Sequence, residues 1–308
     1  MRILVTGVSG YVGAALAPSH ARAGHTVRGF ARSRERVAAA GVELDELVLG
    51  DVTTGAGLER ALDGVDVAYY LIHSMEGAAA GAFADAERRS ADAFAAAAAR
   101  AGLRRVVYLG GLVPRDAPLS RHLGSRLAVE SALLGAVPEA IALRASIVIG
   151  ARSRSFRFLV RLIERLPVMA LPAWRENRTA PIDGRDMLEY LARAATAPSE
   201  LAGRSWDIGG PDVMTYAAMI ARISDALMVR RPALGLGLSL TPVASVVAAA
   251  IAGEDPALIE PLMESLEHDL LPRDGDAAGA FGVRLHKFDA AVERALREWE
   301  HTEELAAR

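Results

Sequence analysis

The chain contains no cysteine among its 308 residues. This absence excludes disulfide bonds, thiolate catalysis and cysteine-ligated metal sites. Lysine is almost absent too, because Lys287 is the only one and arginine carries nearly all of the positive charge. Five of the seven histidines are scattered without the spacing of metal ligands. We therefore expect no metal site in this protein.

The sequence has no long block of like charge, and its net charge is −3 with a pI near 6.2. It lacks the basic footprint of a nucleic-acid-binding protein, so we expect no nucleic-acid partner. The 52% of apolar residues can fill a sizeable core. The class indicated is a globular protein with a small-molecule function. Nothing in the sequence indicates an oligomeric state.

One uncharged segment, residues 233–253, has the length that spans a bilayer. Pro242 interrupts it, however, and four leucines alternate with glycine and serine in its first part, as they do in a strand. We predict a strand, a break at Thr241–Pro242 and a buried helix to Ala252, with a membrane span as the alternative. The apolar run that begins at residue 2 leaves no room for a secretory signal. We therefore expect a cytoplasmic protein.

The first residues carry the strongest motif. Met1–Thr6 is an apolar run typical of a buried strand, and a glycine turn and the start of a helix follow directly. The G-x-x-G-x-x-G spacing provides a tight turn, close backbone approach to phosphate and free N–H groups at a helix start. The pattern predicts a dinucleotide site, and a purely structural turn is the alternative. The residues expected to contact the cofactor here are Gly7, Ser9, Gly10, Tyr11, Val12 and Gly13.

The end of the second predicted strand, at residues 26–30, bears on the choice of cofactor. An Asp or Glu at this place holds the 2′-hydroxyl of NAD, whereas an Arg accommodates the 2′-phosphate of NADP. Arg32, Ser33 and Arg34 follow the strand, with no carboxylate before Glu35. Because guanidinium binds phosphate through two parallel hydrogen bonds, this segment favours NADP(H). The alternative is that these arginines lie on a solvated loop.

Strands and helices alternate through the first half of the chain. Apolar runs predict strands at residues 47–51, 65–72, 105–111 and 141–149, with helices at 83–100 and 120–134. This rhythm is typical of a doubly wound parallel α/β sheet of the Rossmann kind, which binds ligands at the carboxyl ends of its strands. Further cofactor contacts are therefore expected at strand ends: Asp51, Val52, Leu71, Ile72, His73 and Gly110.

Beyond residue 150 the alternation changes. Apolar residues at helical spacing from Phe156 to Leu166 predict a helix, and residues 206–209 read as a last parallel strand. We predict a dinucleotide-binding domain at 1–150 and 180–210, and a smaller, mainly helical substrate lobe at 151–179 and 211–308. Five large apolar residues are candidates for the wall of a substrate slot: Phe156, Met169, Leu171, Trp174 and Trp206.

Four motifs together resemble the short-chain dehydrogenase/reductases, and within them the atypical, extended, NmrA-like branch: T-G-x-x-G-x-x-G, G-D-V after strand three, Y-L-G-G after strand five and W-D-I-G-G-P near residue 206. The resemblance covers essentially the whole chain. It implies chemistry by Ser, Tyr and Lys in the order S…Y-x-x-x-K, with an Asn on the preceding helix. The single lysine and the single asparagine, Asn177, exclude that arrangement here.

The resemblance places other residues at those positions. Gly110-Gly111 replaces the serines, His122 stands at the place of the tyrosine, and Arg126 stands at the place of the lysine, one helical turn later. His122 and Ser74 are the candidate catalytic residues. The alternative for His122 is a ring that only hydrogen-bonds ribose or backbone. The alternative for His73 and Ser74 is that they lie beside the cofactor only through their backbone. Arg126 is expected near the ribose or the nicotinamide, with a surface salt bridge to Glu130 as the alternative.

An intact cofactor site without the usual acid predicts reduction of an easily reduced carbonyl. The hypothesis is an NADPH-dependent ketoreductase of the angucyclinone type, acting on a quinone or on an aromatic polyketide ketone whose neighbouring phenol yields the proton. General acid catalysis is worth ~10²–10⁴-fold, and positioning supplies about 7–11 kcal/mol without it. Two alternatives are a redox sensor that binds NADP(H) without catalysis and an assembly subunit that retains nucleotide as a scaffold.

Overall fold

The computed structural model describes residues 1–72, 80–115, 119–229, 231–235, 263, 266–273 and 275–305. In these ranges seven parallel strands form the main sheet, in the order β11-β6-β5-β4-β1-β2-β3. The predicted doubly wound Rossmann-like α/β fold is confirmed. The strands are β1 (Arg2–Thr6), β2 (Thr26–Ala31), β3 (Glu46–Leu49), β4 (Val67–Tyr70), β5 (Arg105–Gly111), β6 (Ile141–Ala145) and β11 (Arg204–Ile208).

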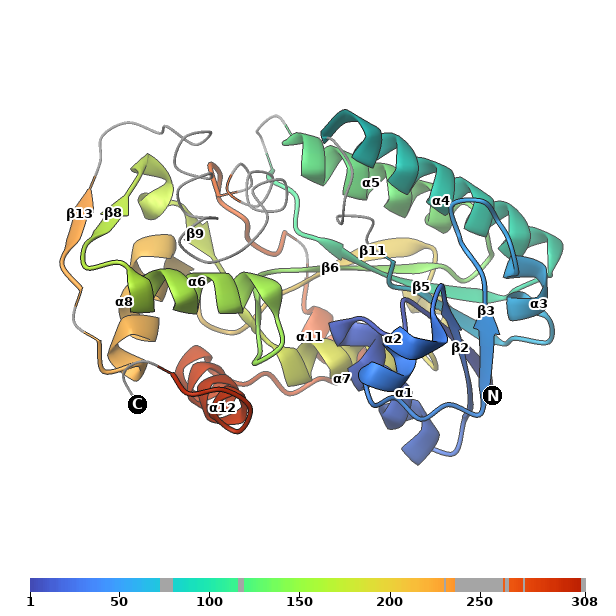
Figure 1. Cartoon of the computed structure of the whole chain (residues 1–308). Coiled ribbons are helices and arrows are strands. Elements are labelled where there is room, and N and C mark those ends of the chain that lie inside the picture. The colour runs from blue at the N-terminus through green and yellow to red at the C-terminus, as the bar shows by residue number, and fades with distance from the viewer. Residues whose placement is uncertain are drawn as a thin grey trace.

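Both faces of this sheet are buried, because successive side chains of each strand enter opposite cores. Ile3 and Tyr69 enter one core, and their neighbours Leu4 and Tyr70 enter the other. Figure 1 shows helices above and below the sheet. The helices of the first core are α1 (Tyr11–Arg22), α7 (Gly184–Ala194) and α11 (Ala277–Phe281), and those of the second are α3 (Leu58–Leu62), α4 (Ala80–Arg100) and α5 (Arg121–Leu134). The short α2 (Arg34–Ala39) follows β2.

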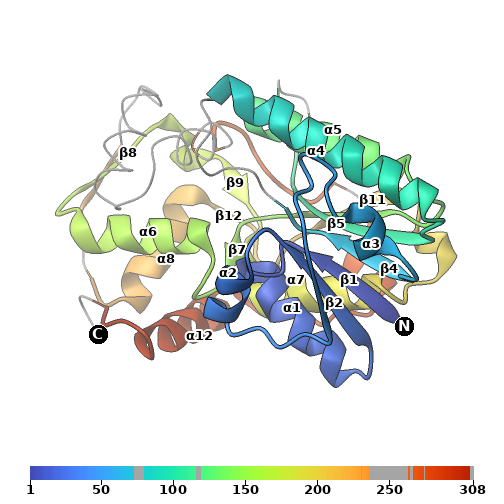
Figure 2. The ribbon, with the colours of Figure 1, turned by 45° about the vertical axis from the view of Figure 1, so that its right-hand side comes forward.

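A third core lies beside the carboxyl ends of the strands, where Figure 2 shows α6, α8 and α12 gathered. Phe156 and Trp299 are fully enclosed in it. Its elements are α6 (Arg154–Arg165), β8 (Met169–Leu171), η1 (Ala173–Glu176), β12 (Met214–Thr215), α8 (Tyr216–Ala226) and α12 (Phe288–Glu300). β9 (Arg178–Thr179) pairs with β12, β13 (Ala233–Gly235) pairs with β8, and η2 (Ser199–Leu201) precedes β11. The proposed residue boundaries of two domains remain a prediction.

The predicted strand at 141–149 is wrong in one respect, because the chain leaves the sheet after Ala145. The Ser146 N–H makes the last bond of the ladder between β6 and β11, to the carbonyl of Ile208 at 3.0 Å. The chain then forms β7 (Val148–Ile149), which pairs with β10 (Ile182–Asp183). This change of partner brings the residues after β6 over the sheet edge, toward the third core.

Two further predictions are shortened or fall outside the described ranges. The fourth strand covers only Val67–Tyr70, because the Leu71 N–H is bound by the Thr6 hydroxyl at 3.2 Å. In the uncharged segment, Ala233–Gly235 is the predicted strand and pairs in parallel with β8. Residues 236–253, with the predicted break and helix, lie outside the described residues. Among the helices that the structure describes, none is both long and apolar enough to cross a membrane.

Candidate functional site

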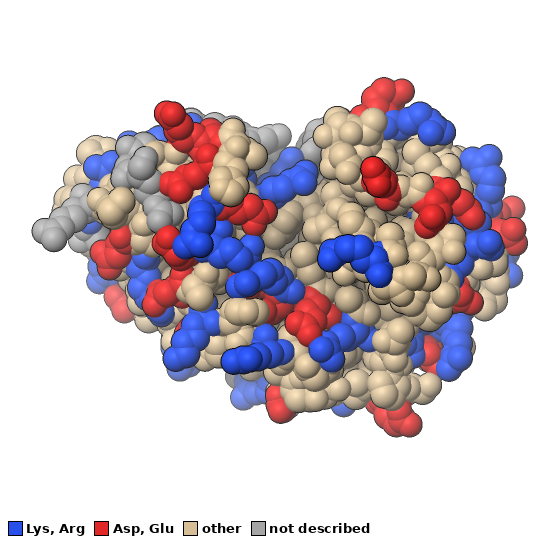
Figure 3. Space-filling model, turned by 90° about the horizontal axis from the view of Figure 1, so that it is seen from below, with Lys and Arg blue, Asp and Glu red and all other residues tan. Residues whose placement is uncertain are grey.

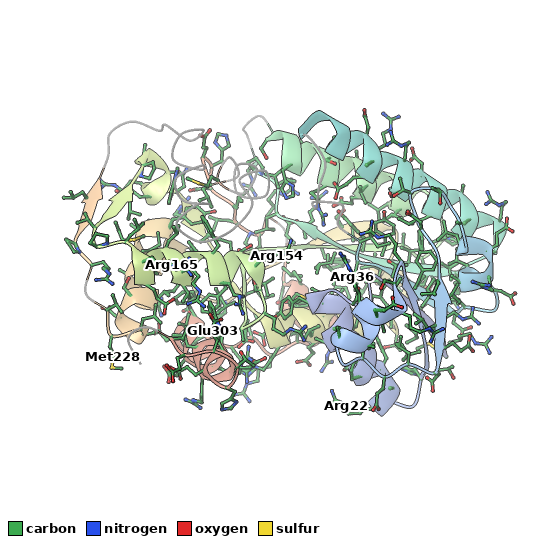
Figure 4. All side chains as sticks on the ribbon, viewed as in Figure 1. Arg22, Arg36, Arg154, Arg165, Met228 and Glu303 are labelled. Carbon is green, nitrogen blue, oxygen red and sulfur yellow. The ribbon has the colours of Figure 1, made fainter. Side chains whose placement is uncertain are left out.

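A cavity of about 1060 Å³ lies between the carboxyl ends of the strands and the third core. The glycine turn, the ends of β2, β5 and β6, the start of α6 and parts of η1 and α8 line it. Figure 4 shows Arg36 on α2 and Arg154 at the start of α6, on the two sides of this space. The size fits a dinucleotide together with part of a substrate. This position is where open α/β sheets bind ligands.

The glycine turn has the shape that a pyrophosphate needs. Gly7 has φ +65°, and a Cβ there would lie 2.8 Å from the carbonyl oxygen of Leu71. A Cβ on Gly13 would lie 2.5 Å from the carbonyl oxygen of Gly7. The first N–H groups of α1 have no partners within their helix and face the cavity. The residues present therefore fit the phosphates of a dinucleotide.

Tyr11, Ser9 and Val12 line the cavity, and their contact with a cofactor stays a prediction. The Tyr11 hydroxyl fills the space beside Gly184, where a Cβ would lie 2.6 Å from it. Burial raises the pKa of Tyr11 to about 12, partly offset by the positive charge of Arg294. The phenol is therefore neutral at pH 7. Its packing fixes the start of α1 against the segment that leads to the third core.

The arginines after β2 differ from the prediction in one position. Arg32 lines the cavity, but Arg34 lies in a separate surface recess with Arg28 and Glu46. Ser33 is the N-cap of α2, since its hydroxyl accepts from the Arg36 N–H at 3.1 Å. The helix that begins there brings Arg36, and not Arg34, to the cavity. Ser33, a residue type preferred at helix N-caps, was the sequence signal that a helix begins here.

The predicted contacts at the strand ends lie together. Asp51 and Val52 line the cavity below β3, where Asp51 Oδ1 accepts from the Thr53 N–H at 2.8 Å. Leu71, Ile72 and Gly110 line it at the ends of β4 and β5. His73 and Ser74 lie outside the described residues.

His122 faces the cavity from the first turn of α5. Burial, and to a smaller extent the positive charge of Arg126, lower the pKa of His122 to about 4. The imidazole is therefore neutral at pH 7 and holds no spare proton to give as an imidazolium. Its buried Nδ1 has no hydrogen-bond partner among the described residues. This ring can accept or donate one hydrogen bond to a bound molecule.

Arg126 also lines the cavity, within a buried polar network. Its Nη1 lies 3.4 Å from Glu87 Oε1, and its Nη2 donates to the Leu109 carbonyl at 3.0 Å. The Ser125 hydroxyl donates to the other oxygen of Glu87 at 2.7 Å. Both Glu87 and Arg126 are more than nine-tenths buried. Arg126 is therefore fixed at the end of β5, and its contact with ribose or nicotinamide stays a prediction.

The alternative partner that we considered for Arg126 is wrong. Glu130 binds Arg144 through two hydrogen bonds of 2.5 and 2.9 Å and accepts a third from Ser205. These partners lie on β6 and β11, on the other side of α5. The ion pair of Arg126 is thus internal and links α5 to α4.

Of the candidates for the apolar wall, Trp174 lines the cavity. Phe156, Met169 and Leu171 are packed in the third core, and Trp206 packs against Phe281. The wall also contains residues that the sequence did not identify, because they come from distant segments. They are Ser146, Phe158, Leu159, Thr179, Tyr216, Met219 and Ile220.

Charge elsewhere on the molecule is mixed. Figure 3 shows basic and acidic side chains interleaved over one face of the protein. In the part of the chain that the structure describes, no group of three or more His, Cys, Asp or Glu is arranged to hold a metal ion. Among the described residues, the cavity is therefore the main candidate for a functional site.

Residues 1–128 match the NmrA-like family model. A ceramide reductase of Caulobacter vibrioides is 28% identical over 197 residues, which are 64% of this chain and 61% of that protein. An Arabidopsis thaliana protein, the mitochondrial NADH dehydrogenase 1 alpha subcomplex subunit 9, is 26% identical over 43% of this chain and 33% of its own length. The chain thus spans less than two thirds of both curated relatives.

Solved structures match over almost the entire chain. The crystal structure of gox2253 has a TM-score of 0.75 at 21% identity, covering 97% of this chain and 98% of that one. A short-chain dehydrogenase/reductase superfamily protein from Agrobacterium tumefaciens with bound NAD has a TM-score of 0.69 at 20% identity, with the same coverage. The NAD-dependent dehydratase TunA has a TM-score of 0.71 at 16% identity, covering all of both chains. The amino-terminal part thus matches the NmrA-like family, and the chain as a whole has the Rossmann-like α/β fold of these solved structures.

Proposed function

We propose that this protein is an NADPH-dependent oxidoreductase that reduces a carbonyl group of a largely apolar substrate. The observation that carries the proposal is one cavity lined by the glycine turn, by five arginines, of which Arg32 and Arg36 follow β2, and by an apolar wall. Binding of NAD by structural neighbours of the same fold supports the cofactor class. The Caulobacter relative, named for reduction of a lipid, supports the reaction class.

The substrate that we propose is an aromatic polyketide ketone or a quinone. When bound, the reduced nicotinamide supplies hydride. The N–H groups of α1 bind the pyrophosphate, Arg32 and Arg36 bind the 2′-phosphate, and the apolar wall excludes water from the reacting carbonyl. A neutral His122 hydrogen-bonds the substrate without supplying an imidazolium proton. A phenol of the substrate next to the carbonyl then yields the proton.

Arg32→Asp is expected to raise the Kd for NADPH by about 10–100-fold, because it removes a charge-assisted contact and repels the 2′-phosphate. The Kd for NADH should change less than about threefold. Titration calorimetry with both nucleotides measures the two values. Arg34→Asp is the matched control, since it makes the same charge change outside the cavity. Equal effects of the two substitutions on NADPH would contradict the assignment of the phosphate contact.

Turnover decides between an enzyme and a sensor. We expect NADPH oxidation, followed at 340 nm, with a panel of quinones and hydroxylated aryl ketones, and faster reduction where a phenol lies next to the carbonyl. His122→Ala is expected to slow substrate-assisted reduction less than about tenfold. Tight NADPH binding without turnover, together with a co-purifying protein, would instead support a redox sensor. A collapse of kcat in His122→Ala would show that the protein supplies the acid.

A further inference from the structure

Two buried polar groups in the cavity wall lack the partners that such groups normally have. Trp174 is 8% exposed and Tyr216 is 1% exposed. Neither Trp174 Nε1 nor the Tyr216 hydroxyl has a hydrogen-bond partner among the described residues. The two rings are perpendicular, with centroids 6.0 Å apart. Most buried polar side-chain atoms in proteins are hydrogen-bonded, so each exception requires an explanation.

The other tryptophans show what is missing at Trp174. Trp206 Nε1 donates to the Leu201 carbonyl at 2.9 Å, and Trp299 Nε1 donates to Glu303 at 3.0 Å. Those two side chains lie outside the cavity wall, whereas Trp174 belongs to it. An indole N–H only donates, so its missing partner must be an acceptor.

Tyr216 has a similar position. Burial raises its pKa, partly offset by the nearby Thr179 hydroxyl, so the phenol is neutral at pH 7. Thr179 Oγ1 already shares a hydrogen bond of 3.1 Å with Ser146 Oγ. The Tyr216 hydroxyl has no partner within hydrogen-bond distance among the described residues, so its proton is available to a bound acceptor.

The pair lies in the part of the wall that follows the ends of β5 and β6. Ser146 follows Ala145, which is in register with Gly111 at the end of β5. Thr179, Tyr216 and Trp174 thus continue from the strand ends into the apolar wall. Six apolar residues line the same cavity: Phe158, Leu159, Met219, Ile220, Met263 and Leu266.

We propose that Trp174 Nε1 and the Tyr216 hydroxyl form a substrate subsite that binds an oxygen acceptor on an otherwise apolar ring system. This inference rests on the proposed function, because the proposed function identifies the cavity as a substrate site. An apolar molecule without an acceptor would leave both donors unpaired. The pair therefore selects oxygenated apolar compounds, such as ketones and quinones, over hydrocarbons of the same shape.

The test compares 1-tetralone with tetralin, which has the same bicyclic skeleton and lacks the carbonyl oxygen. Titration calorimetry on the full chain with NADP⁺ present measures both affinities. We expect the wild type to prefer 1-tetralone. Trp174→Phe and Tyr216→Phe should each shift the ratio of the two affinities toward tetralin by about tenfold. The affinity for tetralin itself should stay within about twofold of the wild-type value. Trp206→Phe is the matched control and should change neither value.

Each other result overturns the subsite. It is contradicted if both ligands weaken alike in the variants, if the wild type does not prefer the ketone, or if neither ligand binds. Circular dichroism and NADPH affinity establish that each variant is folded with its cofactor site intact. If the ratio shifts as expected but 1-tetralone and related ketones are not reduced, the proposed reaction fails while the subsite stands.

Discussion

Gly13→Ala is expected to lower NADPH affinity by on the order of 100-fold and the free energy of unfolding by about 1–3 kcal/mol. The new Cβ would lie 2.5 Å from the carbonyl oxygen of Gly7 and 2.8 Å from Val8 Cα. Both are backbone atoms, so the glycine turn and the start of α1 must move apart. That movement displaces the N–H groups proposed to bind the pyrophosphate. Titration calorimetry and denaturant unfolding measure the two effects.

Alanine substitutions at two other glycines should affect NADPH affinity less than Gly13→Ala does. A Cβ on Gly10 would lie 3.2 Å from the same carbonyl, so Gly10→Ala should weaken NADPH binding less. A Cβ on Gly124, within α5, meets nothing within 4 Å. Gly124→Ala should therefore keep NADPH affinity and stabilise the protein by up to about 1 kcal/mol. If Gly13→Ala binds NADPH as well as Gly124→Ala does, the turn is not the phosphate cradle.

The sequence predicted those helices and strands whose boundaries are set by residues adjacent in the chain. β5 covers Arg105–Gly111 as expected, because its apolar run is bounded by glycine turns. Helix α5 follows its cap at Ser120, whose hydroxyl accepts from the Leu123 N–H at 3.2 Å. These features need no distant partner. Their boundaries were therefore accessible from the sequence.

Distant partners explain what the sequence did not reveal. The chain leaves β6 after Ala145 and pairs at β7 with β10, whose Ile182 lies 34 positions beyond Val148, although the residues after Ser146 still read as a strand. The spacing of His122 and Arg126 was visible, but Glu87, which binds Arg126, lies on another helix. In the same way, Trp174 and Tyr216 become neighbours only in the folded chain.

Glu87→Leu is expected to lower the free energy of unfolding by about 3 kcal/mol, because it removes the carboxylate that pairs with the buried Arg126. Arg126→Met should cost a similar amount, since it leaves the Glu87 carboxylate in the interior. The double variant should lose clearly less than the sum, with a coupling of about 1–3 kcal/mol. Denaturant unfolding of the four proteins measures this cycle.

A surface pair provides the control. Glu189 and Arg193 form an exposed ion pair one helical turn apart, with side chains 39% and 48% exposed. Glu189→Gln should cost less than about 1 kcal/mol. If the losses at Glu87 and Arg126 are additive, the two groups do not act as a pair and the network does not hold Arg126 in place.

The same cycle separates a structural from a cofactor-binding role of Arg126. Glu87→Leu keeps the guanidinium at the cavity, whereas Arg126→Met removes it. If Arg126 contacts the ribose or the nicotinamide, Arg126→Met should weaken NADPH binding by about tenfold more than Glu87→Leu does, at similar stability. Equal NADPH affinities in the two variants would instead make Arg126 only a link between α4 and α5. Arg126 would then have a structural role, and the proposed hydride transfer would depend on the glycine turn and the apolar wall alone.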